Sequence, residues 1–264
     1  MAVERIMPEA VGTYGPVDLR EHVARYEFAY PFVRDGFVGL DIACGSGYGT
    51  NMLTRDRNVK FYGVDICQET VKYARTKYAN DKIEFIQKDA TALDFTSQSF
   101  DLIVSFETIE HITKEKGPEF LKRMRNMLKD DGTFIISCPN RDTYSKGYNE
   151  NPYHLYEYSF PEIFDPIKTY FSVNTIYCHK IRYFKKFPKK FSQLLKHLPP
   201  SLINTLTDIA KKQYLNARNL AKINPILRIF LYERYFGDNF FPYIENYNAY
   251  KPSAFIFVCK KGRI

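Results

Sequence analysis

The 264 residues suffice for one large domain with a sizeable core, and a composition of 45% hydrophobic and 26% charged residues excludes a disordered chain. The net charge of +8 is concentrated near the C-terminus, because the segment from His179 onward holds 17 Lys or Arg against 4 Asp or Glu. The five cysteines form no CxxC pair, no signal peptide is evident, and no apolar run approaches the ~20 residues that span a bilayer. We therefore expect a globular protein of the reducing cytoplasm.

An alternation of helical patterns and short apolar runs begins near the N-terminus, where Asp18 is the expected cap of a helix that reaches about Val33. Strands are predicted at Val38–Ala43, Lys60–Val64, Ile83–Gln87, Phe100–Phe106 and Thr133–Cys138. Helices are predicted at Gly47–Arg57, Glu69–Lys77 and Pro118–Leu128. This alternation indicates an α/β fold, with a doubly wound and mostly parallel sheet that has helices on both faces.

The pattern loosens after Pro139 into a loop rich in Asn, Tyr and Gly, and two further strands are predicted, Phe171–Cys178 and Ala254–Cys259. The residues between these two strands read as helical and are interrupted by several prolines, which favours an insertion over a separate domain. We predict an N-terminal helix region at 1–34, a core at 35–180 and 253–264, and a helical cap at 181–252, inserted before the last strand.

The predicted cap carries a basic amphipathic pattern, with Phe184, Phe187 and Phe191 at near-helical spacing among lysines. Such a helix could lie on an anionic membrane surface, hold a phosphate-bearing substrate or bind nucleic acid. A helix that packs on the core and presents a solvated lysine face explains the pattern equally well. A membrane-bound cap would make the protein peripheral to the membrane.

The most specific motif is VGLDIACGSGYGT, in which an apolar strand runs into Gly45, Gly47 and Gly49 where a helix should begin. Glycine lets the backbone turn tightly and approach a ligand closely. The spacing departs from the GxGxxG pattern of dinucleotide-binding proteins, and Asp41 would oppose a pyrophosphate but suits a charged amino-acid group. We predict that Gly47→Val abolishes cofactor binding and leaves the fold largely intact, because the added side chain would project into the ligand channel.

Two further acids follow the next two strands. Asp65 ends the second strand, where a carboxylate can accept hydrogen bonds from both hydroxyls of a ribose. Asp89 follows the third strand and could accept from an adenine amino group, while Ala90 offers a backbone donor. Each acid alone could be a helix cap, but three acids at three successive strand ends favour a nucleoside site.

These motifs resemble those of the class I methyltransferases that use S-adenosylmethionine: DIACGSG is similar to their first motif, GVDI to their second and KDAT to their adenine-contacting segment. The resemblance covers about Phe37 to Asn140 and implies a seven-stranded sheet with an antiparallel last strand. EHVARYEFA resembles a helix that lines the methionine end of the cofactor, although an exposed helix face with a core tyrosine explains it as well. The residues expected to contact the cofactor are Arg25, Asp41, Ala43, Gly45, Gly47, Asp65, Ile66, Asp89, Ala90 and Phe106.

A candidate chemical site follows the fourth strand, where SFETIEHI places Glu107, Glu110 and His111 on one face of a predicted helical turn. His154 lies in a loop after the fifth strand that can reach the same edge of the sheet. Two carboxylates and two imidazoles could bind a divalent cation such as Mg²⁺ or Mn²⁺, which would lower the pKa of a substrate hydroxyl. Without a metal, His111 is the expected general base and His154 would orient the substrate.

The segment ETIEH, together with His154 to Tyr158, resembles metal-dependent methyltransferases that act on the 3′-terminal 2′-hydroxyl of small RNAs, and ETIEH is also similar to ubiquinone-biosynthesis O-methyltransferases. The overall layout resembles bacterial methyltransferases of surface-glycan and secondary-metabolite pathways. We therefore expect O-methylation of a saccharide, a glycoconjugate or another small molecule. RNA is the weaker alternative, since no RNA-binding domain is recognisable, and a protein that binds S-adenosylmethionine without catalysis is the third.

Overall fold

The structure is a computed structural model and describes residues 16–143, 151–181, 240–242 and 252–262. Its strands are β1 (Val38–Ile42), β2 (Lys60–Asp65), β3 (Ile83–Gln87), β4 (Phe100–Phe106), β5 (Leu128–Pro139), β6 (Phe171–Ile181), β7 (Phe240–Pro242) and β8 (Pro252–Lys261). Its α-helices are α1 (Pro16–Ala29), α2 (Tyr48–Thr54), α3 (Gln68–Tyr78), α4 (Gly117–Met127) and α5 (Phe160–Tyr170). Short 3-10 turns are η1 (Tyr30–Phe32), η2 (Ala90–Ala92), η3 (Ile109–His111) and η4 (Lys114–Lys116).

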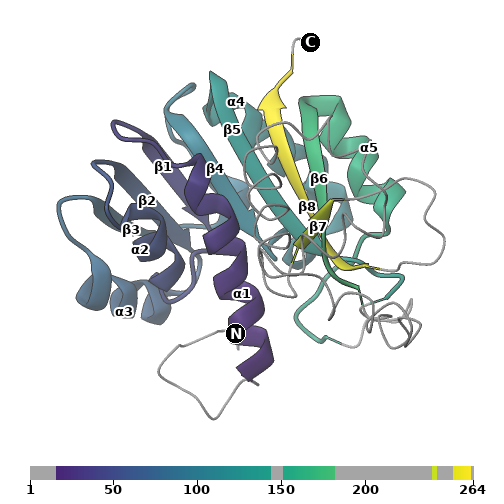
Figure 1. Cartoon of the computed structure of the whole chain (residues 1–264), viewed down its shortest axis with the longest axis horizontal. Coiled ribbons are helices and arrows are strands. Elements are labelled where there is room, and N and C mark those ends of the chain that lie inside the picture. The colour runs from purple at the N-terminus through teal and green to yellow at the C-terminus, as the bar shows by residue number, and fades with distance from the viewer. Residues whose placement is uncertain (1–15, 144–150, 182–239, 243–251, 263–264) are drawn as a thin grey trace, which may run out of the picture. The chain divides into compact units, whose positions relative to one another are not determined.

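The strands form one sheet in the order β3-β2-β1-β4-β5-β8-β6-β7 (Figure 1). The first five pair in parallel from β3 to β5, and β6 pairs with β7 antiparallel. The predicted doubly wound, mostly parallel α/β sheet is therefore confirmed. The three-residue strand β7, which lies within the segment predicted as a cap, adds an edge to the seven strands expected.

The chain order of the strands reverses between β1 and β4, which are neighbours in the sheet although β2 and β3 come between them in the chain. In open α/β sheets, ligands bind beyond the carboxyl ends of the strands at such a reversal. The segments after β1 and β4 are the glycine turn and the Glu-x-x-Glu-His segment. The topology therefore brings the two predicted sites to the same edge of the sheet.

The apolar alternation predicted from the sequence builds the core of this sheet. The largest side chains that are fully buried include Phe61, Phe85, Phe100 and Phe134, one from each of β2 to β5. Burial of each phenylalanine contributes roughly 1.5–3 kcal/mol relative to an exposed position. The strand ends that hold the sites are thus fixed to a rigid interior.

The N-terminal helix and helix α5 also differ from the sequence-based predictions. The N-terminal helix begins at Pro16, before the predicted cap Asp18, and its last turn continues as η1 around Pro31. Helix α5 was absent from the predictions, although Ser159 and Glu162 form a capping box at its start. Ser-x-x-Glu before an apolar run is a known helix-start signal.

The chain divides into two compact units, Met1–Asn174 with Ile256–Ile264 and Thr175–Phe255. The basic amphipathic pattern that begins at Phe184 lies outside the described residues. Among the described helices, none is both long and apolar enough to cross a membrane.

Candidate functional site

The glycine turn after β1 has three residues with positive φ, namely Ala43 at 55°, Gly45 at 54° and Gly47 at 83°. A Cβ on Gly45 would meet no atom within 4 Å, so the backbone there is open to a ligand. A Cβ on Gly47 would instead lie 2.7 Å from Phe85 and 2.8 Å from Ala74, both buried. The prediction that a side chain at Gly47 projects into a ligand channel is therefore wrong: the position faces the core.

Asp41, near the end of β1, is fully buried. Its carboxylate accepts hydrogen bonds from Thr50 Oγ1 at 2.7 Å and from Tyr26 OH at 3.3 Å. Burial raises the pKa of Asp41 to about 7, although both hydrogen bonds lower it. A side chain without exposed surface cannot touch a ligand in this conformation, so the expected direct contact with a cofactor is corrected: Asp41 joins β1 to α1 and α2.

The second acid, Asp65 at the end of β2, forms a hydrogen bond to the glycine turn. One oxygen of Asp65 accepts from the Gly45 amide at 2.9 Å and the other from the Cys67 amide at 2.9 Å. Ile66 follows it and is 57% exposed, which is unusual for a large apolar side chain and suits the face of an adenine ring. Asp65 therefore lies beside the open backbone at Gly45, and its contact and that of Ile66 with a cofactor stay predictions.

The third acid follows β3 and is exposed. Asp89 Oδ1 accepts from the amide and the hydroxyl of Thr91, at 2.7 and 2.8 Å, so this residue is also the cap of η2. Its Oδ2 has no hydrogen bond within the described chain. Ala90 is the first residue of η2, where an amide lacks an acceptor within its own turn. Both groups predicted to meet adenine are therefore available alongside the capping role.

Arg25 of α1 is buried and forms an ion pair with Glu107, with 3.1 Å between Nη2 and Oε2. Its Nε and Nη1 atoms are also buried and have no hydrogen-bond partner within the described residues. Buried guanidinium donors require acceptors, and a carboxylate fits their planar geometry. The carboxylate of the methionine part of S-adenosylmethionine would supply such an acceptor. The two buried Arg25 donors without a partner among the described residues are therefore the observation that fits this cofactor.

Two neighbours shape the surroundings of Arg25. Burial, and to a smaller extent the charge of Arg25, lower the pKa of His22 to about 3, so this imidazole is neutral near pH 7. Phe106, the last residue of β4, is buried and packs edge-to-face on Tyr26 with 5.2 Å between ring centres. This contact packs the end of β4 against α1.

Glu107 lies apart from the other acids and imidazoles. Its backbone has φ of 47°, so it precedes the turn η3 and does not continue it. Its carboxylate accepts from Ser137 Oγ at 2.7 Å and pairs with Arg25. The prediction that Glu107 shares one face of a helical turn with Glu110 and His111 is therefore wrong, because the positive φ directs the chain away between them.

His111 is half-buried at the end of η3, and its Nδ1 lies 2.9 Å from the carbonyl oxygen of Tyr153. A carbonyl oxygen only accepts, so Nδ1 carries the proton in this hydrogen bond. In a neutral imidazole, Nε2 then holds the lone pair. The ring is thereby set up to accept a proton at a known atom.

His154 is buried beside it, with 5.0 Å between the two ring centres and an interplanar angle of 83°. Its Nδ1 lies 2.7 Å from Glu157 Oε1, and its Nε2 lies 3.0 Å from Asn151 Nδ2. The amide orientation follows from Asn151 Oδ1, which accepts from the Tyr153 amide at 3.0 Å. His154 is therefore fixed on both ring nitrogens, and neither Asn151 nor Glu157 was identified as a site residue from the sequence.

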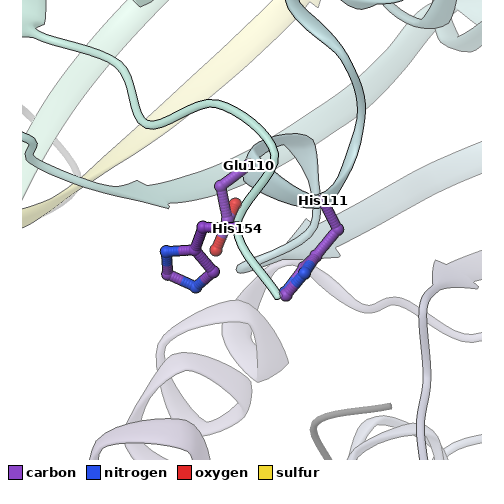
Figure 2. Close-up of side chains that lie close together, drawn as sticks. All are labelled: Glu110, His111 and His154. Atoms are coloured by element: carbon purple, nitrogen blue, oxygen red, sulfur yellow. The ribbon is translucent and has the colours of Figure 1, made fainter. Parts of the chain in front are cut away.

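Figure 2 shows Glu110, His111 and His154 side by side, and one ligand atom from each lies within 4.8 Å of the others. The structure thus brings together three of the four predicted metal ligands and leaves out Glu107. The two nitrogens of His154 already take part in hydrogen bonds, so metal binding through this residue would require Asn151 or Glu157 to move. The donor set fits a divalent cation only in part.

The loop that carries His154 is tied to the core at two places. The Glu110 carbonyl accepts from the amides of Leu155 and Tyr156 at 2.8 and 3.0 Å. Tyr156 donates to Glu162, which also pairs with Arg141 at 2.7 Å. Burial would raise the pKa of Glu162, but hydrogen bonds from Tyr156, Ser159 and Arg141 outweigh it and lower the pKa to about 2. The loop position is therefore set by contacts between residues far apart in the sequence.

Comparison with known families identifies residues 40–136, which match the family described as "Methyltransferase domain". A protein of Mycolicibacterium smegmatis named as an S-adenosylmethionine-dependent methyltransferase is 28% identical over 150 residues, which is 55% of this chain and 56% of that protein. The chain thus spans about half the length of the relatives it matches. Residues 40–136, which match the family, contain the glycine turn, Asp65, Asp89 and η3.

Solved structures share the fold over most of the chain. The cyclase SpnF aligns with a TM-score of 0.57 and 15% identity, over 90% of this chain and 81% of that chain. Phosphoethanolamine N-methyltransferase 2 of Haemonchus contortus, in complex with S-adenosylmethionine, aligns with a TM-score of 0.54 and 17% identity, over 92% and 52%. The chain therefore shares the Rossmann-like fold of these structures, and its residues 40–136 match a methyltransferase domain.

Proposed function

We propose that the chain, whose residues 40–136 carry a methyltransferase domain, transfers a methyl group from S-adenosylmethionine to a hydroxyl of a saccharide, a glycoconjugate or another small molecule. His111 is the general base in this proposal. The single observation that carries it is the hydrogen bond between His111 Nδ1 and the Tyr153 carbonyl, because it leaves Nε2 as the proton acceptor.

Residues of the first three strand ends and of α1 would hold the cofactor. Arg25 would bind the carboxylate of the methionine part, Asp65 the ribose, and Ile66 the adenine face, while the open backbone at Gly45 allows close approach. When bound, S-adenosylmethionine supplies a methyl group on a positively charged sulfur, which is already activated for transfer. The protein therefore has to orient the acceptor and accept its proton.

The acceptor side offers apolar and aromatic surface beside the base. Tyr153 is 39% exposed and Leu155 is 58% exposed, and Tyr153 also provides the carbonyl that binds His111. An exposed tyrosine ring can pack on the apolar face of a sugar ring or of a lipid-like acceptor. This surface supports a saccharide or small-molecule acceptor, and the buried free thiols of the five cysteines agree with a cytoplasmic setting.

The test is a turnover assay with labelled S-adenosylmethionine against soluble saccharides, lipid-linked saccharides, RNA oligomers and phosphoethanolamine, with wild type, His111→Ala and the control Glu115→Gln. General-base catalysis contributes about 10²- to 10⁴-fold, so we expect His111→Ala to lower kcat by at least about 100-fold. Glu115 is exposed on η4, and its variant should match wild type. Methylation of RNA alone, of the amine alone, or full activity of His111→Ala would overturn the proposal.

A second candidate mechanism is metal-assisted, and the cluster of Glu110, His111 and His154 favours it. A cation bound there would hold the acceptor oxygen and lower the pKa of its hydroxyl. Chelator added to the same assay distinguishes the two mechanisms, since the metal-free base predicts unchanged turnover. Loss of activity with chelator and its return with Mg²⁺ or Mn²⁺ would establish the metal-assisted mechanism.

A further inference from the structure

A continuous chain of hydrogen bonds links a buried carboxylate to the proposed base. Glu157, whose side chain is 2% exposed, accepts from His154 Nδ1. His154 Nε2 accepts from Asn151 Nδ2, and Asn151 Oδ1 accepts from the Tyr153 amide. The Tyr153 carbonyl accepts from His111 Nδ1. From Glu157 to His111, each donor therefore has a defined acceptor.

We infer that Glu157 is a positioning residue that determines which ring nitrogen of His111 carries the proton. This inference rests on the proposed role of His111 as the base. A carboxylate only accepts, so it requires the proton of His154 on Nδ1. His154 Nε2 is then an acceptor and orients the Asn151 amide, whose oxygen holds the backbone of Tyr153 beside His111.

The order of these bonds cannot be reversed at one point alone. If the proton of His154 moved to Nε2, it would face the amide donor of Asn151, and a rotated amide would present its donor to the Tyr153 amide. Two donors facing each other lose their hydrogen bond, and an unsatisfied group costs about 1–3 kcal/mol where it is buried, as His154 is. The loop around Tyr153 would then relax, and His111 would lose the acceptor at Nδ1.

The test reads the protonated nitrogen directly, by long-range ¹⁵N–¹H correlation spectra of the full chain labelled at its five histidines. Spectra are taken at about pH 8, above the ordinary histidine pKa of about 6.5. In wild type we expect His111 to carry its proton on Nδ1. In Glu157→Leu we expect the His111 signals to shift toward the Nε2-protonated form that free imidazole side chains prefer. Glu115→Gln should leave them unchanged.

A compensating pair distinguishes positioning from general loss of structure. In Glu157→Leu with Asn151→Asp, the carboxylate at position 151 can accept from His154 Nε2 and from the Tyr153 amide, so the chain closes with His154 in its other tautomer. We expect this double variant to restore the wild-type His111 signals. Asn151→Ala, at a half-buried site, keeps the Glu157–His154 pair and should reproduce the shift.

Turnover provides a second readout with any acceptor that the screen above identifies. A misplacement of about 1 Å in a reacting group can cost about 100-fold, so we expect Glu157→Leu to lower kcat by at least about tenfold and to leave the KM for S-adenosylmethionine unchanged. Wild-type His111 signals in both Glu157→Leu and Asn151→Ala, or a folded double variant without restored signals, would overturn the inference. A screen without a hydroxyl acceptor would overturn the proposed function, and the spectra would still decide the inference.

Discussion

The two sides of the site are built differently. On the cofactor side, the acids predicted from the sequence stand at strand ends, and Asp65 binds the Gly45 and Cys67 amides within and directly after the β1-α2-β2 unit. On the acceptor side, His111 is fixed by Tyr153, which lies 42 residues later in the chain. Strand ends are placed by the sheet, whereas a loop is placed by whatever side chains it meets.

This difference predicts different responses to mutation. A cofactor-side residue should affect the fold or cofactor affinity, according to whether it faces the core or the open edge. An acceptor-side residue should affect turnover and leave cofactor affinity unchanged. The three changes below test the first half of this comparison, and the variants of His111 and Glu157 test the second.

The largest effect is expected from Gly47→Val, compared with Gly45→Ala. Valine at 47 combines a φ of 83° with a Cβ 2.7 Å from Phe85, so we expect a loss of stability of about 3 kcal/mol or more. Alanine at 45 meets no atom and should cost about 1–2 kcal/mol from its positive φ. Urea unfolding measures both, and equal stabilities would contradict the assignment of Gly47 to the core.

Arg25→Met should act on the cofactor. The apolar stem is kept, but the donors expected to bind the methionine carboxylate are lost, and a hydrogen bond to a charged group contributes about 1.5–3 kcal/mol. We expect the Kd for S-adenosylmethionine, measured by calorimetry, to rise by about 10- to 100-fold. Arg55→Met, at an exposed arginine paired with Glu27, should bind as wild type does. Unchanged affinity in Arg25→Met would exclude this contact.

The third change concerns pH. The pKa of Asp41 is about 7 in the folded chain against 3.8 for an ordinary aspartate. As pH rises from 3.8 to about 7, the unfolded chain releases this proton and the folded chain retains it, so the free energy of unfolding should fall. Asp41→Asn should remove this fall. His22, which changes stability in the opposite direction, is present in both chains, so the difference between their urea curves isolates Asp41.

The sequence was sufficient to predict the sheet and the acids at its edge, because strand periodicity and glycine spacing act over a few residues. It misplaced the roles of Asp41 and Gly47, since the direction of a side chain at a strand end depends on the packing of Tyr26 and Phe85 from other elements. Asp41 and Gly47 thus support the cofactor edge from within the core.

The acceptor side was predictable only in part. His111 and His154 were identified as neighbours, and their rings do pack together. The positive φ of Glu107 and the links through Asn151 and Glu157 have no local sequence signal, because they depend on how the loop docks on η3. Long-range hydrogen bonds of this kind emerge only once the tertiary structure is known.

The contact between α1 and α2 depends on one missing side chain. A Cβ on Gly49 would lie 1.9 Å from the ring of Tyr26, and that same ring packs on Phe106 and reaches Asp41. The smallest residue of a seven-residue helix therefore sets the depth to which its fourteen-residue neighbour can settle. A larger residue at position 49 would push α1 outward, separate Arg25 from Glu107 and open the cofactor edge. Position 49 would have this effect without contacting either of those two side chains.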